Sequence, residues 1–97
     1  MQFEWDAGKA RRNFYKHGIA FDGAITAFDD PYALIAPDEK HSSTGKIREW
    51  LIGESDNGVL VVVFTRRHMG QAFRIISARR ASRRERRGYE EFKRVSL

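Results

Sequence analysis

The sequence predicts an α+β domain in which two N-terminal helices precede a four-stranded antiparallel sheet and a final helix. Two changes of hydrophobic pattern carry this prediction. Apolar residues recur at helical spacing up to about residue 28, alternate or run continuously between residues 32 and 80, and return to helical spacing afterwards. Because 97 residues supply one modest core, a single domain over residues 1–97 is expected, with the helices packed on one face of the sheet.

The first helix is predicted from Ala7 to His17, after a short extended segment at residues 3–5. Asp6 is suited to cap this helix, because its carboxylate can accept hydrogen bonds from free backbone N–H groups. Gly18 can adopt the left-handed conformation that ends helices. A second, short helix is expected to begin with Asp22 as its cap and to stop at the Asp-Asp-Pro sequence that follows.

Four strands are predicted next, joined by turns. Alternation marks three of them, whereas a continuous apolar run marks the third as a central strand; their ranges are 32–36, 46–54, 59–66 and 71–80. Asn57-Gly58 is the strongest hairpin signal, because both residue types accept the positive φ of a tight turn. In the last strand, strict alternation places Arg74 and Arg79 on opposite faces of the sheet.

The final helix is predicted over Arg83–Lys93. Ser82 and Glu85 form a capping box, in which each side chain bonds the backbone N–H of the other residue. The apolar stripe of this helix is thin, since it consists mainly of Tyr89 and Phe92.

The positive charge is concentrated near the C-terminus. Residues 74–94 hold nine basic and three acidic groups, whereas the residues before them hold nine basic and ten acidic groups. A local basic patch attracts polyanions, which makes nucleic acid the leading class of partner. The alternative interpretation is a solvated face that docks an acidic protein.

Composition excludes several classes of protein. The chain has no cysteine, so it carries neither a disulfide framework nor a thiolate metal site, and a reducing cytoplasmic location is expected. It has no apolar run long enough to span a membrane. Glycine-rich nucleotide loops, GxSxG and HExxH are absent, and the spacing of His17, His41 and His68 fits no metal motif. No cofactor and no metal are therefore expected.

Arginines near strand ends are the candidate phosphate ligands. Arg66 and Arg74 are expected to lie across a hairpin on one sheet face, with Arg79 and Arg80 at the end of the last strand. A guanidinium held by a rigid strand offers a planar fork that suits a phosphate. The alternatives are an edge charge that prevents aggregation, or an ion pair with Glu49.

RNA cleavage without metal is compatible with these residues. The ribose 2′-OH attacks the adjacent phosphorus, so the enzyme needs a proton acceptor, a proton donor and cations near the phosphate. Trp50 either stacks on a base or fills the core. No His or Glu pair stands out as acid and base, so the residues alone support only a basic nucleic-acid-binding domain.

Three segments carry a resemblance to a known family. FEWDAGKARRNFYKHGIAF, AITAFDDP and RIISARRASRRERRGYEE resemble the BrnT family of bacterial type II toxins, over Phe3 to Glu91. The resemblance implies a RelE-like fold and an endoribonuclease that cleaves RNA and inhibits translation. It also implies neutralisation by a BrnA-like antitoxin, and it leaves open a homodimer or a 2:2 toxin–antitoxin assembly.

The resemblance also implies a site of basic and aromatic groups on the concave sheet face. Two arginines lie within the matched RIISAR motif and four further residues follow from their position in the fold; this catalytic set is Arg74, Arg79, Arg48, Trp50, Thr65 and Arg66. A second set is expected to attract RNA, with a solvated helix face as the alternative; it comprises Arg80, Arg83, Arg84 and Arg87. His17 is expected to cap its helix or to shuttle protons. The competing function is a binding domain without chemistry.

Overall fold

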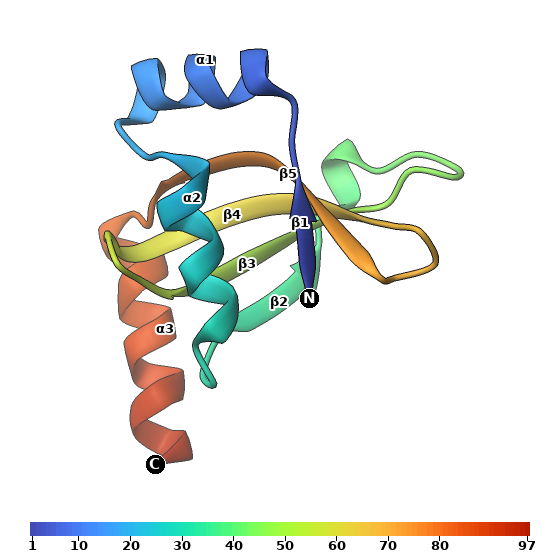
Figure 1. Ribbon diagram of the computed structural model, residues 1–97. Helices are drawn as coiled ribbons and strands as arrows, with labels where there is room; N and C mark the ends of the chain where they lie inside the picture. The colour runs from blue at the N-terminus through green and yellow to red at the C-terminus, as the bar shows by residue number, and fades with distance from the viewer.

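A five-stranded sheet forms the centre of the computed structural model, which describes residues 1–97 (Figure 1). The strand order is β1-β5-β4-β3-β2, with β1 parallel to β5 and every other pair antiparallel. The strands are β1 (Gln2–Glu4), β2 (Leu34–Pro37), β3 (Arg48–Ser55), β4 (Gly58–Arg67) and β5 (Ala72–Arg80). The α+β class is confirmed, and β2 to β5 lie close to the four ranges predicted for antiparallel strands.

The prediction of only four strands is wrong, because β1 adds a fifth at the edge. Phe3 pairs in parallel with Phe73, and Glu4 with Arg74. A strand of three residues is too short to show an alternating hydrophobic pattern. It forms through its contacts with β5. The aromatic rings of Phe3 and Phe73 lie 5.8 Å apart and reinforce this pairing.

The helices are α1 (Ala7–His17), α2 (Phe21–Ala24) and α3 (Arg83–Ser96), with short 3₁₀ turns η1 (Ile25–Asp29) and η2 (Glu39–His41). The first helix is confirmed at both ends. The backbone N–H of Lys9 donates to Asp6 Oδ2 at 2.9 Å, which lowers the pKa of Asp6, and Gly18 has a φ of 72°. None of these helices is long and apolar enough to cross a membrane.

The second predicted helix is confirmed in place but not in form. It is a single α-turn that tightens into η1, and it ends at Asp30, before the proline. The residue at its cap is Ala20, which makes no side-chain capping bond, so the prediction of Asp22 as the cap is wrong. Asp22 instead lies in the first turn, where its negative charge is attracted to the free N–H groups of the helix start without capping them.

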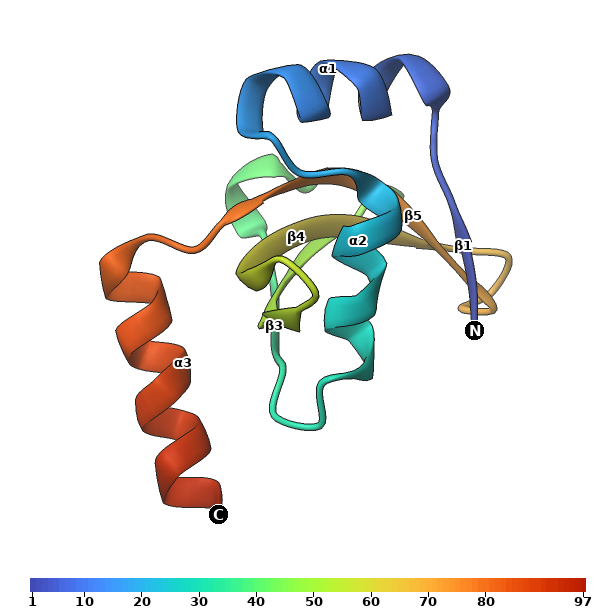
Figure 2. The ribbon, with the colours of Figure 1, turned by 60° about the vertical axis from the view of Figure 1, so that its left-hand side comes forward.

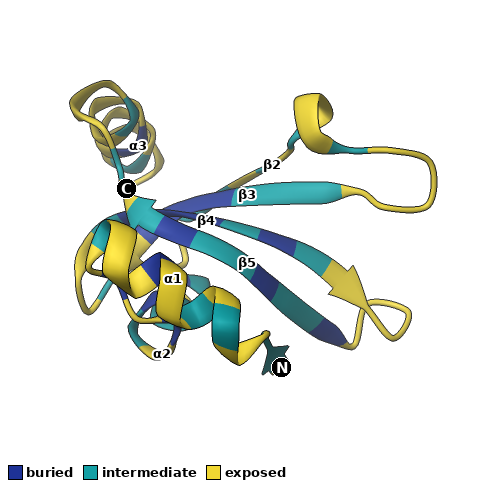
Figure 3. Ribbon diagram, turned by 90° about the horizontal axis from the view of Figure 1, so that it is seen from above, coloured by how far each residue is buried: buried dark blue, intermediate teal, exposed yellow.

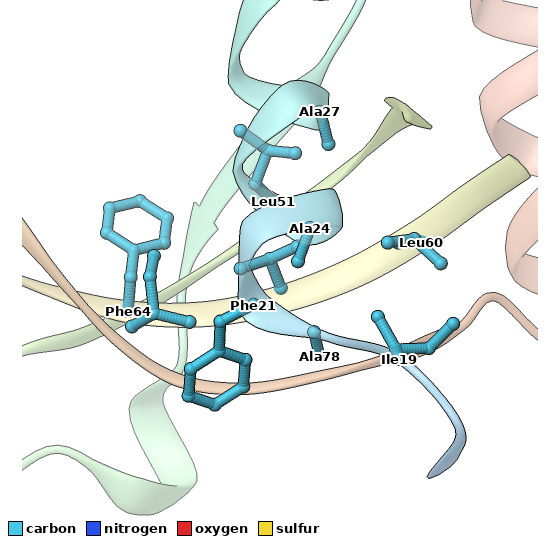
Figure 4. Packing of buried hydrophobic residues seen from close by; sticks show 10 residues of the cluster. Ile19, Phe21, Ala24, Ala27, Leu51, Leu60, Phe64 and Ala78 are labelled. Carbon is cyan, nitrogen blue, oxygen red and sulfur yellow. The ribbon is translucent and has the colours of Figure 1, made fainter. Parts of the chain in front are cut away.

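The helices lie on both faces of the sheet, which corrects the prediction of a single helical face. The larger core packs α2 and η1 on one face, where Phe21, Leu51 and Phe64 are buried (Figure 4). On the other face, Tyr89 of α3 packs against Ile52 and Val61. Figures 2 and 3 show α3 beside one end of the sheet, so it covers only part of that second face.

Tyr89 and Asp30 tie α3 to the rest of the molecule. The buried Tyr89 hydroxyl donates to Asp30 Oδ2, which also accepts from the backbone N–H of Glu54 at 2.7 Å. Burial and this hydrogen bond raise the pKa of Tyr89. Burial opposes ionisation of Asp30, but the hydrogen bonds outweigh it and lower the pKa of that carboxyl. The predicted capping box of α3 is confirmed, since Ser82 Oγ accepts from Glu85 N at 3.1 Å and Ser82 N donates to Glu85 Oε1 at 2.8 Å.

A β-bulge in β5 changes which residues share a face. Val63 pairs with Ser77 but Phe64 pairs with Ile75, so one residue of β5, Ile76, has no partner on β4. Ile75 and Ala78 are consequently buried in the same core, three positions apart. Strict alternation along this strand was the wrong prediction, because the bulge shifts the pattern by one residue.

The turns between β3 and β4 and between β4 and β5 both contain left-handed residues. The predicted hairpin at Asn57-Gly58 is confirmed, but Gly58 alone takes a positive φ, at 88°, and Asn57 does not. This arrangement matches a turn followed by a left-handed glycine, where the sequence signal had suggested two left-handed residues. Between β4 and β5 three successive residues are left-handed, namely His68, Met69 and Gly70.

Candidate active site

Four polar residues form a row across the sheet on the face that α3 leaves partly uncovered. Glu4 of β1 pairs with Arg74 of β5, Arg74 with Thr65 of β4, and Thr65 with Arg48 of β3. Directly paired residues point to the same face, so these four side chains stand side by side. Neighbouring strands are about 4.8 Å apart, and the row is therefore about 14 Å long. We refer to Glu4, Arg74, Thr65 and Arg48 as the polar row.

A hollow of about 190 Å³ lies over three members of the polar row, Arg48, Thr65 and Arg74, and Glu4 lies beside it next to Arg74. Most of its lining residues are cationic and none is acidic; they are Lys9, Gly45, Lys46, Ile47, Arg48, Thr65, Arg66, Arg67, Arg74 and Ile76. Lys9 comes from α1 and Lys46 from the loop before β3, so separate elements bring their charges to one place. This basic hollow is suited to an anion, and phosphate is one of the anions that arginine binds with two parallel hydrogen bonds.

Arg48 is held at its end of the polar row by the preceding loop. Its backbone N–H donates to Ser42 Oγ at 3.0 Å, and Ser42 Oγ donates to the carbonyl of Asp38 at 2.7 Å. The backbone N–H of Asp38 in turn donates to the carbonyl of Arg48 at 2.8 Å. These bonds fix the backbone at the start of β3, where a flexible loop would otherwise leave Arg48 poorly placed.

Glu4 carries the negative charge of the polar row. Its Oε1 lies 3.6 Å from Arg74 Nη1 and 3.7 Å from Arg67 Nε, and its Oε2 lies 3.6 Å from His68 Nε2. All three distances exceed ordinary hydrogen-bond lengths, so the carboxylate is surrounded by cations but firmly bonded to none. Glu4 and Arg74 are each about one-third exposed, at 35% and 32%.

Arg66 does not lie with Arg74, which corrects the expectation that the two share a face. It pairs with Phe73, one position along β5, and therefore points to the opposite side. Its Nε donates to Glu49 Oε1 at 2.6 Å and its guanidinium lies 5.3 Å from the Phe73 ring. The bond to Glu49 raises the pKa of Arg66. The observed contacts of Arg66 agree with the alternative interpretation of this residue, an ion pair with Glu49.

Arg79 shares the face of Arg74 but lies outside the basic hollow. Its register partner is Val61, near α3, and the two arginines are about 16 Å apart along the strand. Its Nη1 and Nη2 donate to the two oxygens of Glu85 at 2.7 and 2.9 Å. This pair lowers the pKa of Glu85 to about 2 and raises that of Arg79. The guanidinium N–H groups of Arg79 that could bind a phosphate are thus already bonded to Glu85 of the capping box.

Trp50 lies on the face of the polar row, two residues along β3 from Arg48. It is half-buried and packs against the cluster of Ile52, Val61 and Tyr89. Its position beside the polar row is compatible with stacking on an RNA base, and its packing against this cluster gives it a structural role as well.

The remaining predicted residues lie apart from the polar row. Four arginines at the end of β5 and on the first turns of α3 are exposed; they are Arg80, Arg83, Arg84 and Arg87. His17 is half-buried at the end of α1 and borders a separate hollow with Lys9, Ile76 and Ser77. No group of three or more His, Asp or Glu side chains is arranged to hold a metal ion.

Sequence reasoning missed Glu4, Lys9 and Lys46. Glu4 belongs to a strand that the pattern did not reveal, and Lys9 is on a helix whose position beside the edge of β5 was unknown. A parallel pairing of the FEW segment with the RIIS segment would have placed Glu4 beside Arg74, but no local signal indicates that pairing.

Comparison with known families gives one match. A family model described as "Ribonuclease toxin, BrnT, of type II toxin-antitoxin system" matches residues 5–85. This range includes Arg48, Thr65 and Arg74 and stops at Glu85, and Glu4 lies just outside it. Among curated proteins, none matches the chain.

Proposed function

We propose, on the premise that this chain belongs to the BrnT family of ribonuclease toxins of type II toxin–antitoxin systems, that it cleaves RNA at the polar row. The observation that carries this proposal is the alignment of Arg48, Thr65 and Arg74 beneath the basic hollow. The cleavage is endonucleolytic, and it inhibits translation by destroying RNA that the ribosome needs.

In this proposal Arg74 and Arg48 bind the phosphate at the cleaved bond from its two sides. Their Cα atoms are two strand spacings apart, about 10 Å, and both side chains are long enough to meet over Thr65. Thr65 donates its hydroxyl hydrogen to a phosphate oxygen. Lys9, Lys46 and Arg67 add positive charge that attracts the RNA backbone.

The proposed reaction uses no metal ion. Attack by the neighbouring 2′-OH builds negative charge on the phosphorane oxygens, and arginines fixed on strands stabilise such charge without reorganisation. In this proposal Trp50, two residues from Arg48 on the same face of β3, contacts a base. The exposed set of Arg80, Arg83, Arg84 and Arg87 extends the basic surface for RNA. Arg66 and Arg79 are assigned to the support of this site through their carboxylate partners.

A type II toxin has an antitoxin protein as its partner. We infer that this antitoxin is BrnA-like, that toxin and antitoxin form a 2:2 assembly or that the toxin pairs with itself, and that the system works in the cytoplasm. The proposed architecture is a single RelE-like domain in which β1 extends the edge of the sheet.

Mapping of RNA 5′ ends after induced expression tests the function. New 5′ ends and growth arrest are expected from the unmodified toxin, and purified protein should cleave RNA in the presence of EDTA. Arg74→Ala should abolish both effects while the circular dichroism spectrum is unchanged. Arg86→Ala on the exposed surface of α3 is the matched control, because it removes the same charge far from the polar row.

Two outcomes would contradict the proposal. Binding of RNA without new 5′ ends would leave the chain as a binding domain without chemistry. Cleavage that stops in EDTA and returns with a divalent cation would retain the ribonuclease and remove the metal-free mechanism.

A further inference from the structure

The geometry points to Glu4 as the general base of RNA cleavage: we propose that its carboxylate takes the proton of the attacking 2′-OH. This inference rests on the proposed function and adds the proton acceptor that the basic residues lack. Glu4 is the one acidic member of the polar row and stands next to Arg74, the residue proposed to bind the phosphate.

The backbone around Glu4 is rigid although it lies in an edge strand. Phe3 packs edge-on against Phe28 with ring centroids 4.9 Å apart, and Trp5 packs edge-on against Phe21 at 5.8 Å. Both flanking side chains are therefore anchored in the larger core, on either side of Glu4. A catalytic group placed between two anchors keeps its position relative to β5, which proton transfer over hydrogen-bond distance requires.

The carboxylate of Glu4 makes no short ion pair, in contrast to Glu49 of β3 and Glu85 of α3, which each pair with an arginine. Glu49 accepts from Arg66 Nε at 2.6 Å, and Glu85 accepts from Arg79 at 2.7 and 2.9 Å. The partners of Glu4 are all 3.6 Å or more away, and the side chain is 35% exposed. An RNA hydroxyl can thus approach its oxygens without displacing a short ion pair.

The charged groups that face Glu4 come from three elements. Arg67 ends β4, His68 begins the turn after it, and Arg74 lies on β5. The two arginine guanidinium groups place positive charge within 4 Å of the Glu4 carboxylate. Two of these residues, Arg67 and Arg74, also line the basic hollow, so the proposed base stands next to the proposed phosphate ligands.

The proposed step is an intramolecular transfer at phosphorus. The 2′-OH gives its proton to Glu4, and the oxygen lone pair forms the new bond to phosphorus. The bond from phosphorus to the 5′ oxygen breaks, and that oxygen keeps the bonding pair and takes a proton from a water molecule. The products are a 2′,3′-cyclic phosphate and a free 5′-OH, and Glu4 afterwards returns its proton to the hydroxide left in the solvent.

Single-turnover cleavage of a short RNA by the purified toxin, in EDTA and across a series of pH values, tests this role. The unmodified toxin should show a rate that rises tenfold per pH unit at the acidic end, where the base loses its proton. Glu4→Gln should lower the rate by about 100-fold or more and remove that rise. Glu4→Asp should restore part of the rate and the pH dependence.

Binding separates a base from a group that only positions Arg74. Affinity for the same RNA with a 2′-deoxy residue at the cleaved bond should change by less than about threefold in Glu4→Gln, because a base contributes to the chemical step and not to phosphate binding. Glu91→Gln is the matched control. Its carboxylate lies on the exposed surface of α3, where it pairs with Arg94.

The outcomes distinguish this inference from the function beneath it. Cleavage by Glu4→Gln at the unmodified rate with the acidic limb intact would overturn the role of Glu4 and leave the ribonuclease in place. A parallel loss of binding and rate, with the acidic limb intact, would also overturn it and make Glu4 a positioning residue. No cleavage by the unmodified toxin would overturn both proposals.

Discussion

The side-chain amide of Asn13 pairs with both backbone polar groups of Ala78. Asn13 Nδ2 donates to the Ala78 carbonyl at 2.9 Å, and the Ala78 N–H donates to Asn13 Oδ1 at 3.1 Å. Because β1 pairs with β5 only as far as Arg74, this amide occupies the place of the missing strand further along the edge. Asn13 Nδ2 also donates to the carbonyl of Ile19 at 3.1 Å, so it joins α1, the following turn and β5.

Asn13→Ala should therefore lower the free energy of unfolding by about 2–4 kcal/mol, because it leaves buried backbone groups of β5 without partners. Asn13 is only 7% exposed, so water replaces these bonds poorly. Urea denaturation followed by circular dichroism measures the change. Arg12→Ala, on the exposed side of the same helix, should change it by less than about 0.5 kcal/mol. A similarly small effect of Asn13→Ala would show that the amide is not needed to hold α1.

The salt dependence of RNA binding should distinguish Arg74 from Arg79. Each phosphate contact to single-stranded RNA contributes about −0.7 to the slope of log affinity against log salt. Arg74→Ala and Arg48→Ala should each make the slope shallower by about that amount. Arg79→Ala should leave it nearly unchanged, since Glu85 already occupies its guanidinium. An equal effect of all three substitutions would place the phosphate path along the whole of β5.

Arg66→Leu should leave RNA cleavage within about threefold of the unmodified toxin, even though the residue borders the basic hollow. Its guanidinium is committed to Glu49 and to the Phe73 ring on the other face. Loss of this partly exposed pair should lower the free energy of unfolding by about 1 kcal/mol or less. Rates from the same EDTA assay check the first expectation. A loss as large as that of Arg74→Ala would return Arg66 to the catalytic set.

Stability should fall in acid partly through Glu85. Its pKa is about 2 in the folded protein, below the ordinary 4.5, mainly because Arg79 hydrogen-bonds its ionised form. The pair therefore stabilises the fold above about pH 4.5, and this contribution is lost as pH falls from there towards 2. A shift of this size corresponds to about 3 kcal/mol in full, which solvent screening reduces to about 1–2 kcal/mol.

Urea denaturation between pH 2 and 6 measures this contribution. Glu85→Gln should be less stable than the unmodified protein at pH 6, and the difference should shrink as the pH is lowered. A difference that stays constant across this range would mean that the Arg79–Glu85 pair does not link folding to protonation of Glu85.

Elements with local signals were predictable from the sequence, because their stabilising contacts lie within a few residues. Asp6 and Gly18 bound α1, and Ser82 with Glu85 begins α3, by hydrogen bonds inside one turn. The hairpin at Asn57-Gly58 was located for the same reason. The cap of α2 was missed since an acidic residue in a first turn and one at a cap give the same sequence signal.

Features that depend on distant contacts could not be predicted. The parallel pairing of β1, the bulge at Ile76 and the position of α3 on the second face all arise from packing between remote segments. The site inherits these errors. Strict alternation put Arg74 and Arg79 on opposite faces, although the bulge brings them to the same one. Closeness in the hairpin suggested that Arg66 lies beside Arg74. Glu4 was not a candidate because strand β1 was not predicted.

The polar row draws on residues 4, 48, 65 and 74, which are spread over three-quarters of the chain. During synthesis Glu4 is among the first residues made, and it has no partner strand until β5 has been translated and has paired with β1. A ribosome that stops before Arg74 therefore releases a fragment with no assembled site. If RNA is cleaved at the polar row as we propose, the order of the strands delays toxicity until about three-quarters of the toxin's own message has been read.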